Sequence, residues 1–299
     1  GRTGAGYMKM RLTKCGIWFL TSLFAVVFIT DTGPGLSRFS AHAAGISDKI
    51  ELSDVERAWL AEHPVILLGV DSAYPPFEFI EDRVDYRGIA SDYIELIGER
   101  LGGVNFKVVL GMSWSDVIAG VKARKIDVLP AVTNTAARRE FLNFTRPYIK
   151  YPTVILTRSD HGQVNGLDDF AGKTVELVKG YYYVEEVLKR YGDIKPLYVE
   201  DPRQALIAVS TGQADAAVEN MAVSAYVMET ELISNVKVAA EADLDGDGLS
   251  FGVRKDWSLL PGILEKALAS ISRAEHSAIR NKWAVQQVKT EPSSQWNLS

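Results

Sequence analysis

The sequence contains few of the residues that carry redox or metal chemistry. Only one of its 299 residues is cysteine, Cys15, so no disulfide can form within the chain. The four histidines, at positions 42, 63, 161 and 276, lie far apart and show no metal-ligand spacing. These scarcities exclude a disulfide framework and a histidine-cysteine zinc site. We therefore expect no metal and no cofactor.

The chain also has no excess of basic residues and no second long hydrophobic run. It carries 33 Lys and Arg against 38 Asp and Glu, a formal net charge of −5, without a basic tract. Nucleic-acid binding needs a clustered basic surface, so we expect no nucleic-acid partner. Beyond residue 30, no apolar run approaches the roughly 20 residues that a membrane-spanning helix needs.

The one long apolar run lies near the N-terminus, over residues 15–30. Lys9, Arg11 and Lys14 precede it, and the polar stretch after it ends in Ala-His-Ala at residues 41–43. This order is typical of a leader and signal peptide over residues 1–43, which predicts export to the periplasm. Because the polar stretch is long, an uncleaved membrane anchor is the alternative interpretation.

The rest of the chain alternates between strand and helix patterns, which predicts an α/β fold. The expected strands are apolar runs between turn residues, at 65–70, 106–110, 127–129, 174–178, 197–199, 216–218, 236–239 and 249–253. Apolar residues at helical spacing predict helices near 89–101, 117–121, 184–191, 257–271 and 274–285, with another opened by Asp201 and Pro202.

Residues 118–129 and 206–217 share a pattern of helix end, polar turn and an aspartate entering a small apolar strand. Asp127 and Asp215 occupy matching places. The pattern indicates two lobes built alike, although any helix–turn–strand unit can produce it. We expect lobe 1 over 44–151 plus 248–299 and lobe 2 over 152–247, with two crossing strands as a hinge.

Three loops that follow predicted strands are the candidate ligand-binding segments, because open α/β sheets bind ligands at the carboxyl ends of their strands. The first, DSAYPPFEF, holds Asp71, Tyr74 and Phe77, whose rings either wall a pocket or belong to the core rim. The second, GMSWS, places Trp114 just before a helix, where it either stacks on a ligand or packs at the helix entry.

The third loop, TNTAAR, holds Thr133, Thr135 and Arg138, with Arg139 beside them. Hydroxyl groups, free backbone amides and an arginine fork suit a carboxylate, which arginine binds with two parallel hydrogen bonds. Arg139 is the fallback for this role if the register differs by one residue.

These motifs, with FTRPY at 144–148, GKTVELVKG at 172–180 and GQADAAVEN at 212–220, resemble the extracellular solute-binding protein family 3. The resemblance runs from about residue 64 to 283 and implies the type II periplasmic-binding-protein fold, a two-lobed clamshell of small mixed sheets flanked by helices. The lead-in ELSDVERAWLAEHP and the stretch LSFGVRKDW look like the Venus-flytrap sensor modules of bacterial transmembrane signalling proteins.

The resemblance also implies roles for single residues. Tyr74 and Trp114 stand where aromatic rings sandwich the ligand, and Thr133 and Arg138 stand where a hydroxyl and an arginine hold its carboxylate. Gly180 and Tyr181 stand in the lobe 2 loop that supplies backbone amides.

Asn220 stands where transport members often carry an aspartate that binds an α-amine. A neutral amide cannot balance an ammonium charge, so a carboxylate without an amine is as good a candidate ligand as an amino acid. If the ligand has an amine, Asp71, Glu78 or Glu219 is expected to bind it.

We therefore expect a periplasmic binding or sensing domain that closes on a small carboxylate or amino-acid-like ligand, the input module of a membrane-bound signalling protein. The alternative is a free solute-binding component of an ABC transporter. An enzyme on the same fold is a weaker third interpretation, because no nucleophile motif or paired histidine is present. The DLDGDG run at 243–248 resembles the start of a calcium loop, but Arg254 falls where a bidentate glutamate is needed, which favours a polar turn.

Overall fold

The computed structural model describes residues 50–246 and 248–284 of the chain. The predicted signal peptide, its cleavage point and position 247 of the calcium-like run lie outside these residues. None of the helices within the described ranges is long and apolar enough to cross a membrane.

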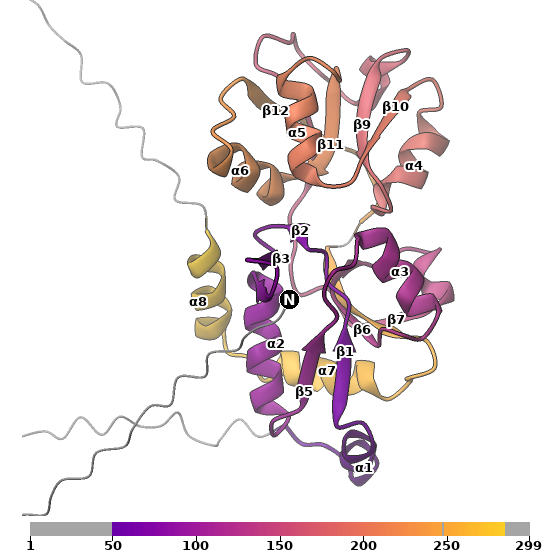
Figure 1. The fold of residues 1–299 in the computed structure, drawn as a ribbon, viewed down its shortest axis with the longest axis vertical. Coiled ribbons are helices and arrows are strands. Elements are labelled where there is room, and N and C mark those ends of the chain that lie inside the picture. The colour runs from indigo at the N-terminus through magenta and orange to yellow at the C-terminus, as the bar shows by residue number, and fades with distance from the viewer. Residues whose placement is uncertain (1–49, 247, 285–299) are drawn as a thin grey trace, which may run out of the picture. The chain divides into compact units, whose positions relative to one another are not determined.

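The described strands form two five-stranded sheets and a small three-stranded one. We call the part built on the first sheet lobe 1 and the part built on the second sheet lobe 2 (Figure 1). The lobe 1 sheet has the order β5-β1-β6-β13-β7, with strands β1 (Val65–Leu68), β5 (Asn105–Val108), β6 (Val128–Thr133), β7 (Leu142–Phe144) and β13 (Leu249–Arg254). The lobe 2 sheet has the order β10-β9-β11-β8-β12, with strands β8 (Thr153–Arg158), β9 (Thr174–Val178), β10 (Lys195–Val199), β11 (Ala216–Asn220) and β12 (Val236–Glu241).

The two sheets have the same mixed topology. In lobe 1 the pairs β1–β5 and β1–β6 are parallel, and β13 runs antiparallel to β6 and β7. In lobe 2 the pairs β9–β10 and β9–β11 are parallel, and β8 runs antiparallel to β11 and β12. The prediction of two similarly built lobes, and of an α/β clamshell with small mixed sheets, is confirmed.

Helices cover both sheets, as right-handed crossovers between parallel strands require. Lobe 1 carries α1 (Asp54–Glu62), α2 (Ile89–Arg100), α3 (Trp114–Lys122), α7 (Leu260–Ala269) and α8 (Arg273–Trp283), and lobe 2 carries α4 (Tyr183–Arg190), α5 (Pro202–Ser210) and α6 (Met221–Thr230). Figure 1 shows α8 beside α2, where the Trp283 indole and the Lys282 ammonium both bind the Asp92 carboxylate.

Local sequence explains where several helices begin. Asp201 caps α5 by accepting a hydrogen bond from the Gln204 amide, and Pro202 stands at the first helical position, as predicted. Ser113 and Asp116 form a capping box at the start of α3, which fixes Trp114 at the first helical residue.

The three-stranded sheet is formed by β2 (Ala73–Tyr74), β3 (Glu78–Glu81) and β4 (Asp85–Arg87), which lie between β1 and α2. The sequence patterns did not predict it, because its strands are two to four residues long. It places the loop containing Asp71 and Tyr74 beside the lobe 1 sheet. Gly88, which ends β4, has φ +119°, and a Cβ there would lie 2.4 Å from the Phe77 carbonyl oxygen, so only glycine fits.

Two chain segments pass between the lobes, one before β8 and one before β13. They pair at a single antiparallel bridge between Ile149 and Leu249. Gly248 enters this bridge at φ +100°, where a Cβ would lie 2.3 Å from the Ile149 carbonyl oxygen. The crossing therefore depends on a glycine that lets the two backbones approach closely.

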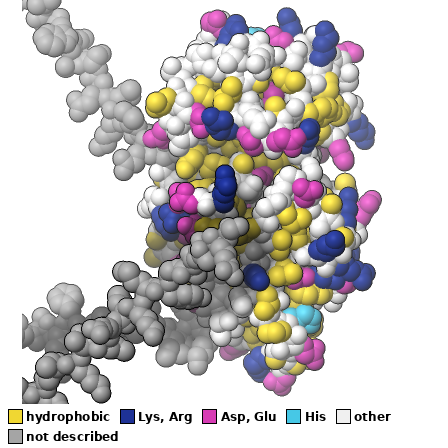
Figure 2. All heavy atoms as spheres, in the orientation of Figure 1, with side chains coloured by type: hydrophobic (Ala, Val, Ile, Leu, Met, Phe, Trp, Pro, Cys, Tyr) yellow, Lys and Arg dark blue, Asp and Glu magenta, His cyan; other side chains and the backbone are white. Residues whose placement is uncertain are grey.

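On the face shown in Figure 2, acidic and basic side chains are interspersed over the described residues.

Candidate functional site: the cavity between the lobes

The candidate site is assembled from loops that follow the parallel strands of both sheets. Asp71 and Tyr74 follow β1, Trp114 follows β5, and Arg138 follows β6 in the short 3-10 helix η2 (Arg138–Glu140). Tyr181 and its neighbours follow β9 of lobe 2. Because each loop lies at the carboxyl end of its strand, four separate stretches of sequence meet at one place.

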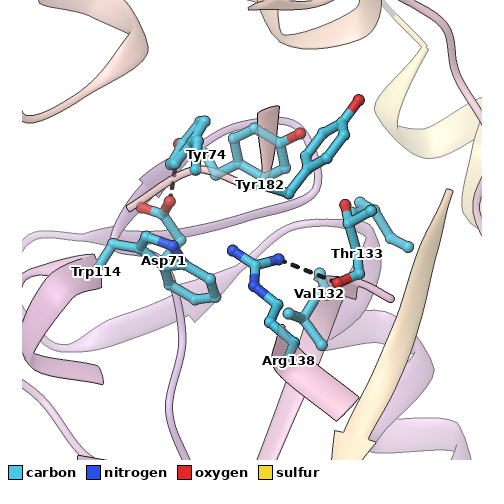
Figure 3. A pocket seen from close by; sticks show the side chains of 10 residues that line it. Asp71, Tyr74, Trp114, Val132, Thr133, Arg138 and Tyr182 are labelled. Carbon is cyan, nitrogen blue, oxygen red and sulfur yellow. Dashed lines mark hydrogen bonds between the residues drawn. The ribbon is translucent and has the colours of Figure 1, made fainter. Parts of the chain in front are cut away.

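These loops surround a cavity of about 30 Å³, which we call the inner cavity (Figure 3). Its lining residues are Asp71, Tyr74, Trp114, Ala131, Val132, Thr133, Arg138, Tyr181, Tyr182 and Leu249. In Figure 3 the Arg138 guanidinium points into the middle of this set, with Trp114 on one side and Thr133 on the other. One cation and one carboxylate therefore face a space that is otherwise lined by aromatic and apolar side chains and by Thr133.

Arg138 is buried, and its backbone and side chain are held at several points. Its amide N–H donates to the Thr135 Oγ1 atom, and its Nη1 donates to the Thr133 carbonyl oxygen at 3.1 Å. Its Nη2 donates across the cleft to the Gly180 carbonyl oxygen at 3.1 Å. A guanidinium has five N–H donors, so three have no protein partner among the described residues. Burial lowers the pKa of Arg138 to about 10, and the side chain remains charged at neutral pH.

Trp114 and Gly180 form a second contact between the lobes. The Trp114 indole N–H donates to the Gly180 carbonyl oxygen at 3.0 Å, and the Arg138 guanidinium lies 5.7 Å from the Trp114 ring centre. Gly180 has φ +75°, and a Cβ there would lie 3.2 Å from the Trp114 ring. A glycine at this position therefore allows the lobe 2 loop to approach the indole.

Asp71 forms the third contact between the lobes. Its Oδ1 accepts the Ala73 amide N–H at 2.9 Å, and its Oδ2 accepts the Tyr181 hydroxyl at 2.8 Å. Burial raises the pKa of Asp71 to about 6. Glu78 lies behind it, where its two oxygens accept the Asp71 amide N–H and the Tyr86 hydroxyl. Burial raises the pKa of Glu78 well above its usual range, and both of its oxygens are engaged within the protein.

The structure brings six of the ten predicted site residues to the inner cavity, namely Asp71, Tyr74, Trp114, Thr133, Arg138 and Tyr181. The other four predicted residues do not line it. Phe77 is fully buried and packs on Tyr74 and Tyr151 as a core residue. Thr135 binds the Arg138 backbone instead, and Gly180 contributes through its carbonyl oxygen.

Asn220 has a structural position that the sequence patterns did not indicate. It is the N-cap of α6, where its Oδ1 accepts the Ala222 amide N–H and its Nδ2 donates to the Tyr151 carbonyl oxygen. Its side chain is therefore engaged at the helix start and does not line the inner cavity. Asn220 alone therefore does not determine whether the ligand carries an amine.

The lobe 2 loop also differs from its expected role as a source of backbone amides. The Tyr181 amide N–H is bonded to the Val178 carbonyl oxygen in a turn, so it is not free for a ligand. Gly180 presents a carbonyl oxygen to Trp114 and Arg138 instead. The fallback residue Arg139 is exposed and binds the Asn134 side chain. The arginine that faces the inner cavity is therefore Arg138 and not its neighbour.

Sequence reasoning missed Tyr182, Ala131, Val132 and Leu249 as cavity-lining residues. Tyr182 is the most informative, because its hydroxyl pairs with Thr153 Oγ1 at 2.6 Å and ties the loop to the first strand of lobe 2. The run of three tyrosines at 181–183 was the available signal. The small residues 131 and 132 line the cavity because β6 is buried along its whole length.

A larger opening of about 640 Å³ lies on the other side of Arg138. Arg138, Tyr181 and Tyr182 form the wall that it shares with the inner cavity. Thr135, Lys122 and Glu185 line its outer part. Within residues 50–246 and 248–284, no group of three or more histidine, cysteine or acidic side chains is placed to hold a metal ion.

The fold and this cavity define a two-lobed α/β solute-binding domain. The family model described as bacterial extracellular solute-binding proteins, family 3, matches residues 66–286, so the chain belongs to that family.

Three relatives show the range of this similarity. The virulence sensor protein BvgS of Bordetella pertussis is 29% identical over 228 residues, which is 76% of this chain and 18% of the relative. The crystal structure of the BvgS periplasmic VFT2 domain is similar with a TM-score of 0.70 and 29% identity, covering 78% of this chain and 99% of that domain. An ancestral arginine-binding protein bound to arginine is similar with a TM-score of 0.66 and 26% identity. The similarity covers 74% of this chain and 98% of that chain.

The sensor relatives are much longer than the region they share with this chain, since it spans about 18% of BvgS. A probable amino-acid ABC transporter-binding protein of Haemophilus influenzae is 26% identical, with 65% of this chain and 72% of the relative covered. The chain is therefore similar both to sensor input domains and to free binding proteins. The prediction of family 3 membership, with likeness to Venus-flytrap sensor domains, is confirmed.

Proposed function

We propose that this chain is a periplasmic ligand-sensing domain whose lobes close on a small carboxylate or amino-acid-like ligand. Arg138 is the observation that carries this proposal. It is a buried guanidinium, facing a cavity between the lobes, with three N–H donors that the described protein groups do not use. An arginine fork beside an indole ring is suited to a planar carboxylate.

Closure of the lobes is the proposed response to the ligand. The hydrogen bonds from Trp114 and Arg138 to Gly180, and from Tyr181 to Asp71, join the two lobes at the site itself. A ligand that contacts both walls binds the closed arrangement more tightly than an open one. Such a difference in affinity is what shifts a two-state hinge.

We also propose that closure is the input to a transmembrane signalling protein. The support is similarity to the sensor protein BvgS and to a histidine kinase sensor domain, whose crystal structure is 27% identical with a TM-score of 0.69. The proposed organisation places a leader and signal peptide at 1–43, lobe 1 at 44–151 plus 248–299, and lobe 2 at 152–247.

The alternative is a free binding component of an ABC transporter, favoured by the similarity to the Haemophilus influenzae protein. The coding sequence after codon 299 discriminates between the two. An apolar span of about 20 residues soon after it supports the sensor, and a stop codon supports the free protein. Catalysis has less support, because Glu78, the buried carboxyl behind the cavity, has both oxygens occupied within the protein.

The test of the binding site compares two neighbouring arginines. The purified chain is first screened by thermal shift against monocarboxylates, dicarboxylates and the common amino acids. With a compound that raises the melting temperature, we expect Arg138→Ala to weaken binding by about 2–4 kcal/mol in calorimetry, because a buried charged pair is lost.

Arg139→Ala is the matched control, because Arg139 is exposed and lies outside the inner cavity. We expect it to leave the affinity unchanged. Loss of binding in Arg139→Ala with normal binding in Arg138→Ala would contradict the assigned register.

A further inference from the structure

Asp71 is the one carboxylate among the residues that line the inner cavity. An α-ammonium group held in this cavity would need it as its charged acceptor, because Glu78, Glu219 and Asn220 do not line the space. Both oxygens of Asp71 already accept a hydrogen bond from the protein. One comes from the Ala73 amide of its own loop, and the other comes from the Tyr181 hydroxyl of the opposite lobe.

The Tyr181 side chain is held firmly in this position. Its ring lies edge-on to the Tyr74 ring at 5.4 Å and to the Tyr183 ring at 5.8 Å, and it is 9% exposed. The inner cavity beside it measures about 30 Å³. An ammonium group that takes the position of the Tyr181 hydroxyl at Asp71 Oδ2 must displace this hydroxyl.

We propose that Tyr181 determines the class of ligand. Its hydroxyl occupies the acceptor on Asp71 that an α-amine would use, so the site selects short carboxylates that carry no amine over the corresponding amino acids. This inference rests on the proposed function, because it presumes that Arg138 holds a ligand carboxylate.

The charges in the cavity are compatible with such a ligand. The carboxylate would accept two parallel hydrogen bonds from the three N–H donors that Arg138 does not use within the protein. The groups that face Asp71 are Tyr181, Glu78, Tyr74 and, further away, Asp201, and the one cation on the wall of the same cavity is Arg138. Burial already raises the pKa of Asp71 to about 6, and a bound anion raises it further. Asp71 can therefore take up a proton when a carboxylate binds, and no ammonium is needed to balance its charge.

The experiment measures paired affinities by calorimetry at pH 7 with the purified chain. The probes are 2-oxo acids and their amino counterparts: glyoxylate and glycine, pyruvate and alanine, and 2-oxobutyrate and 2-aminobutyrate. The variants are Tyr181→Phe, which removes the hydroxyl and keeps the ring, and Tyr181→Phe combined with Asp71→Asn. Tyr183→Phe is the matched control, because the Tyr183 hydroxyl has no hydrogen-bond partner among the described residues and does not line the cavity.

We expect the wild type to bind the 2-oxo acid of at least one pair about tenfold or more tightly than its amino counterpart. Tyr181→Phe should shift that ratio toward the amino acid by about tenfold, equivalent to about 1.4 kcal/mol, because one oxygen of Asp71 becomes free. Adding Asp71→Asn should reverse the shift, and Tyr183→Phe should leave the wild-type ratio unchanged.

Two results would overturn the inference alone and leave carboxylate binding in place. One is a wild-type preference for the amino acid, and the other is a ratio that Tyr181→Phe does not change. Absence of binding of every carboxylate, to the wild type and to all variants, would overturn the proposed function together with this inference.

Discussion

Asp127 of lobe 1 and Asp215 of lobe 2 occupy equivalent positions and make the same backbone contacts. The Asp127 amide donates to the Leu67 carbonyl oxygen at 2.9 Å, and its Oδ2 accepts the Leu67 amide at 2.9 Å. Asp215 makes the same pair of bonds to Thr174, both at 2.8 Å. In each lobe the aspartate lies just before one parallel strand and bonds it to the neighbouring parallel strand, β6 to β1 in lobe 1 and β11 to β9 in lobe 2.

The surroundings of the two aspartates differ. Asp127 is buried, and its Oδ1 accepts a hydrogen bond from the Arg254 guanidinium at 3.0 Å. Asp215 is exposed and makes no ion pair within the described residues. The same backbone contact is therefore reinforced by a buried charge pair in lobe 1 and left to solvent in lobe 2.

The buried glutamates differ between the lobes in the same direction, with the satisfied groups in lobe 1. In lobe 1, both oxygens of Glu78 accept hydrogen bonds. In lobe 2, Glu176 on β9 and Glu219 on β11 are fully buried, and three of their four carboxyl oxygens have no partner among the described residues. Glu176 pairs with Ala217, two residues before Glu219, so the two side chains lie on one face of the sheet. Lobe 2 thus buries carboxyl oxygens without hydrogen-bond partners, whereas the buried glutamate of lobe 1 has a partner for each oxygen.

The largest expected effect is the response of lobe 2 to pH. Burial raises the pKa of Glu176 to about 9 and that of Glu219 to about 8, from an ordinary value of 4.5. The folded state therefore keeps protons that the unfolded state releases above pH 4.5. The free energy of unfolding should fall as pH rises from 5 to 9, by up to about 1.4 kcal/mol per pH unit for each group.

Urea unfolding at several pH values, followed by circular dichroism, measures this slope. The double variant Glu176→Gln with Glu219→Gln cannot ionise at these positions, so its slope should be clearly flatter. Glu95→Gln, at an exposed position on α2, is the control and should follow the wild type. A double variant with the wild-type slope would show that these two carboxyls do not control the pH response.

The second prediction concerns the buried charge pair of lobe 1. Asp127→Ala should lower the free energy of unfolding by about 3 kcal/mol, because it removes the buried partner of the half-buried Arg254 cation and the bond to the Leu67 amide. The remaining contact of Arg254 with Asp256 limits the loss. Urea unfolding at pH 7 measures it, and a loss below about 1 kcal/mol would mean that solvent replaces Asp127 without difficulty.

The sequence was sufficient to predict the architecture because strands buried on both faces appear as continuous apolar runs. The strand expected at 174–178 is β9 to the residue, and Asp201 with Pro202 begins α5 as expected. The short strands β2 to β4 and β7, the longer strand β8, and the helices α1 and α6 were missed. Helix α6 carries apolar residues on all sides and lacks the one-sided pattern by which surface helices are recognised.

The site was only partly predictable, because sequence position does not fix where a side chain points. Tyr181 was expected to contribute its backbone, but its side chain crosses the cleft to Asp71. Asn220 was expected at the ligand, but the start of α6 immediately after β11 makes it a helix cap. The burial of Glu176 and Glu219 was not foreseen either, since glutamates are almost never fully buried without a partner.

The smallest expected effect is that of Asp215→Ala, the counterpart in lobe 2 of Asp127→Ala. It removes the bond to the Thr174 amide, but that amide lies at an exposed strand start where water can replace the carboxylate. A loss of about 1 kcal/mol is expected, the usual contribution of a single hydrogen bond. The same urea titration measures it, and the difference between the two alanine variants isolates the contribution of burial and of Arg254. If both variants lose the same free energy, the ion pair in lobe 1 adds nothing to the backbone contact that the lobes share.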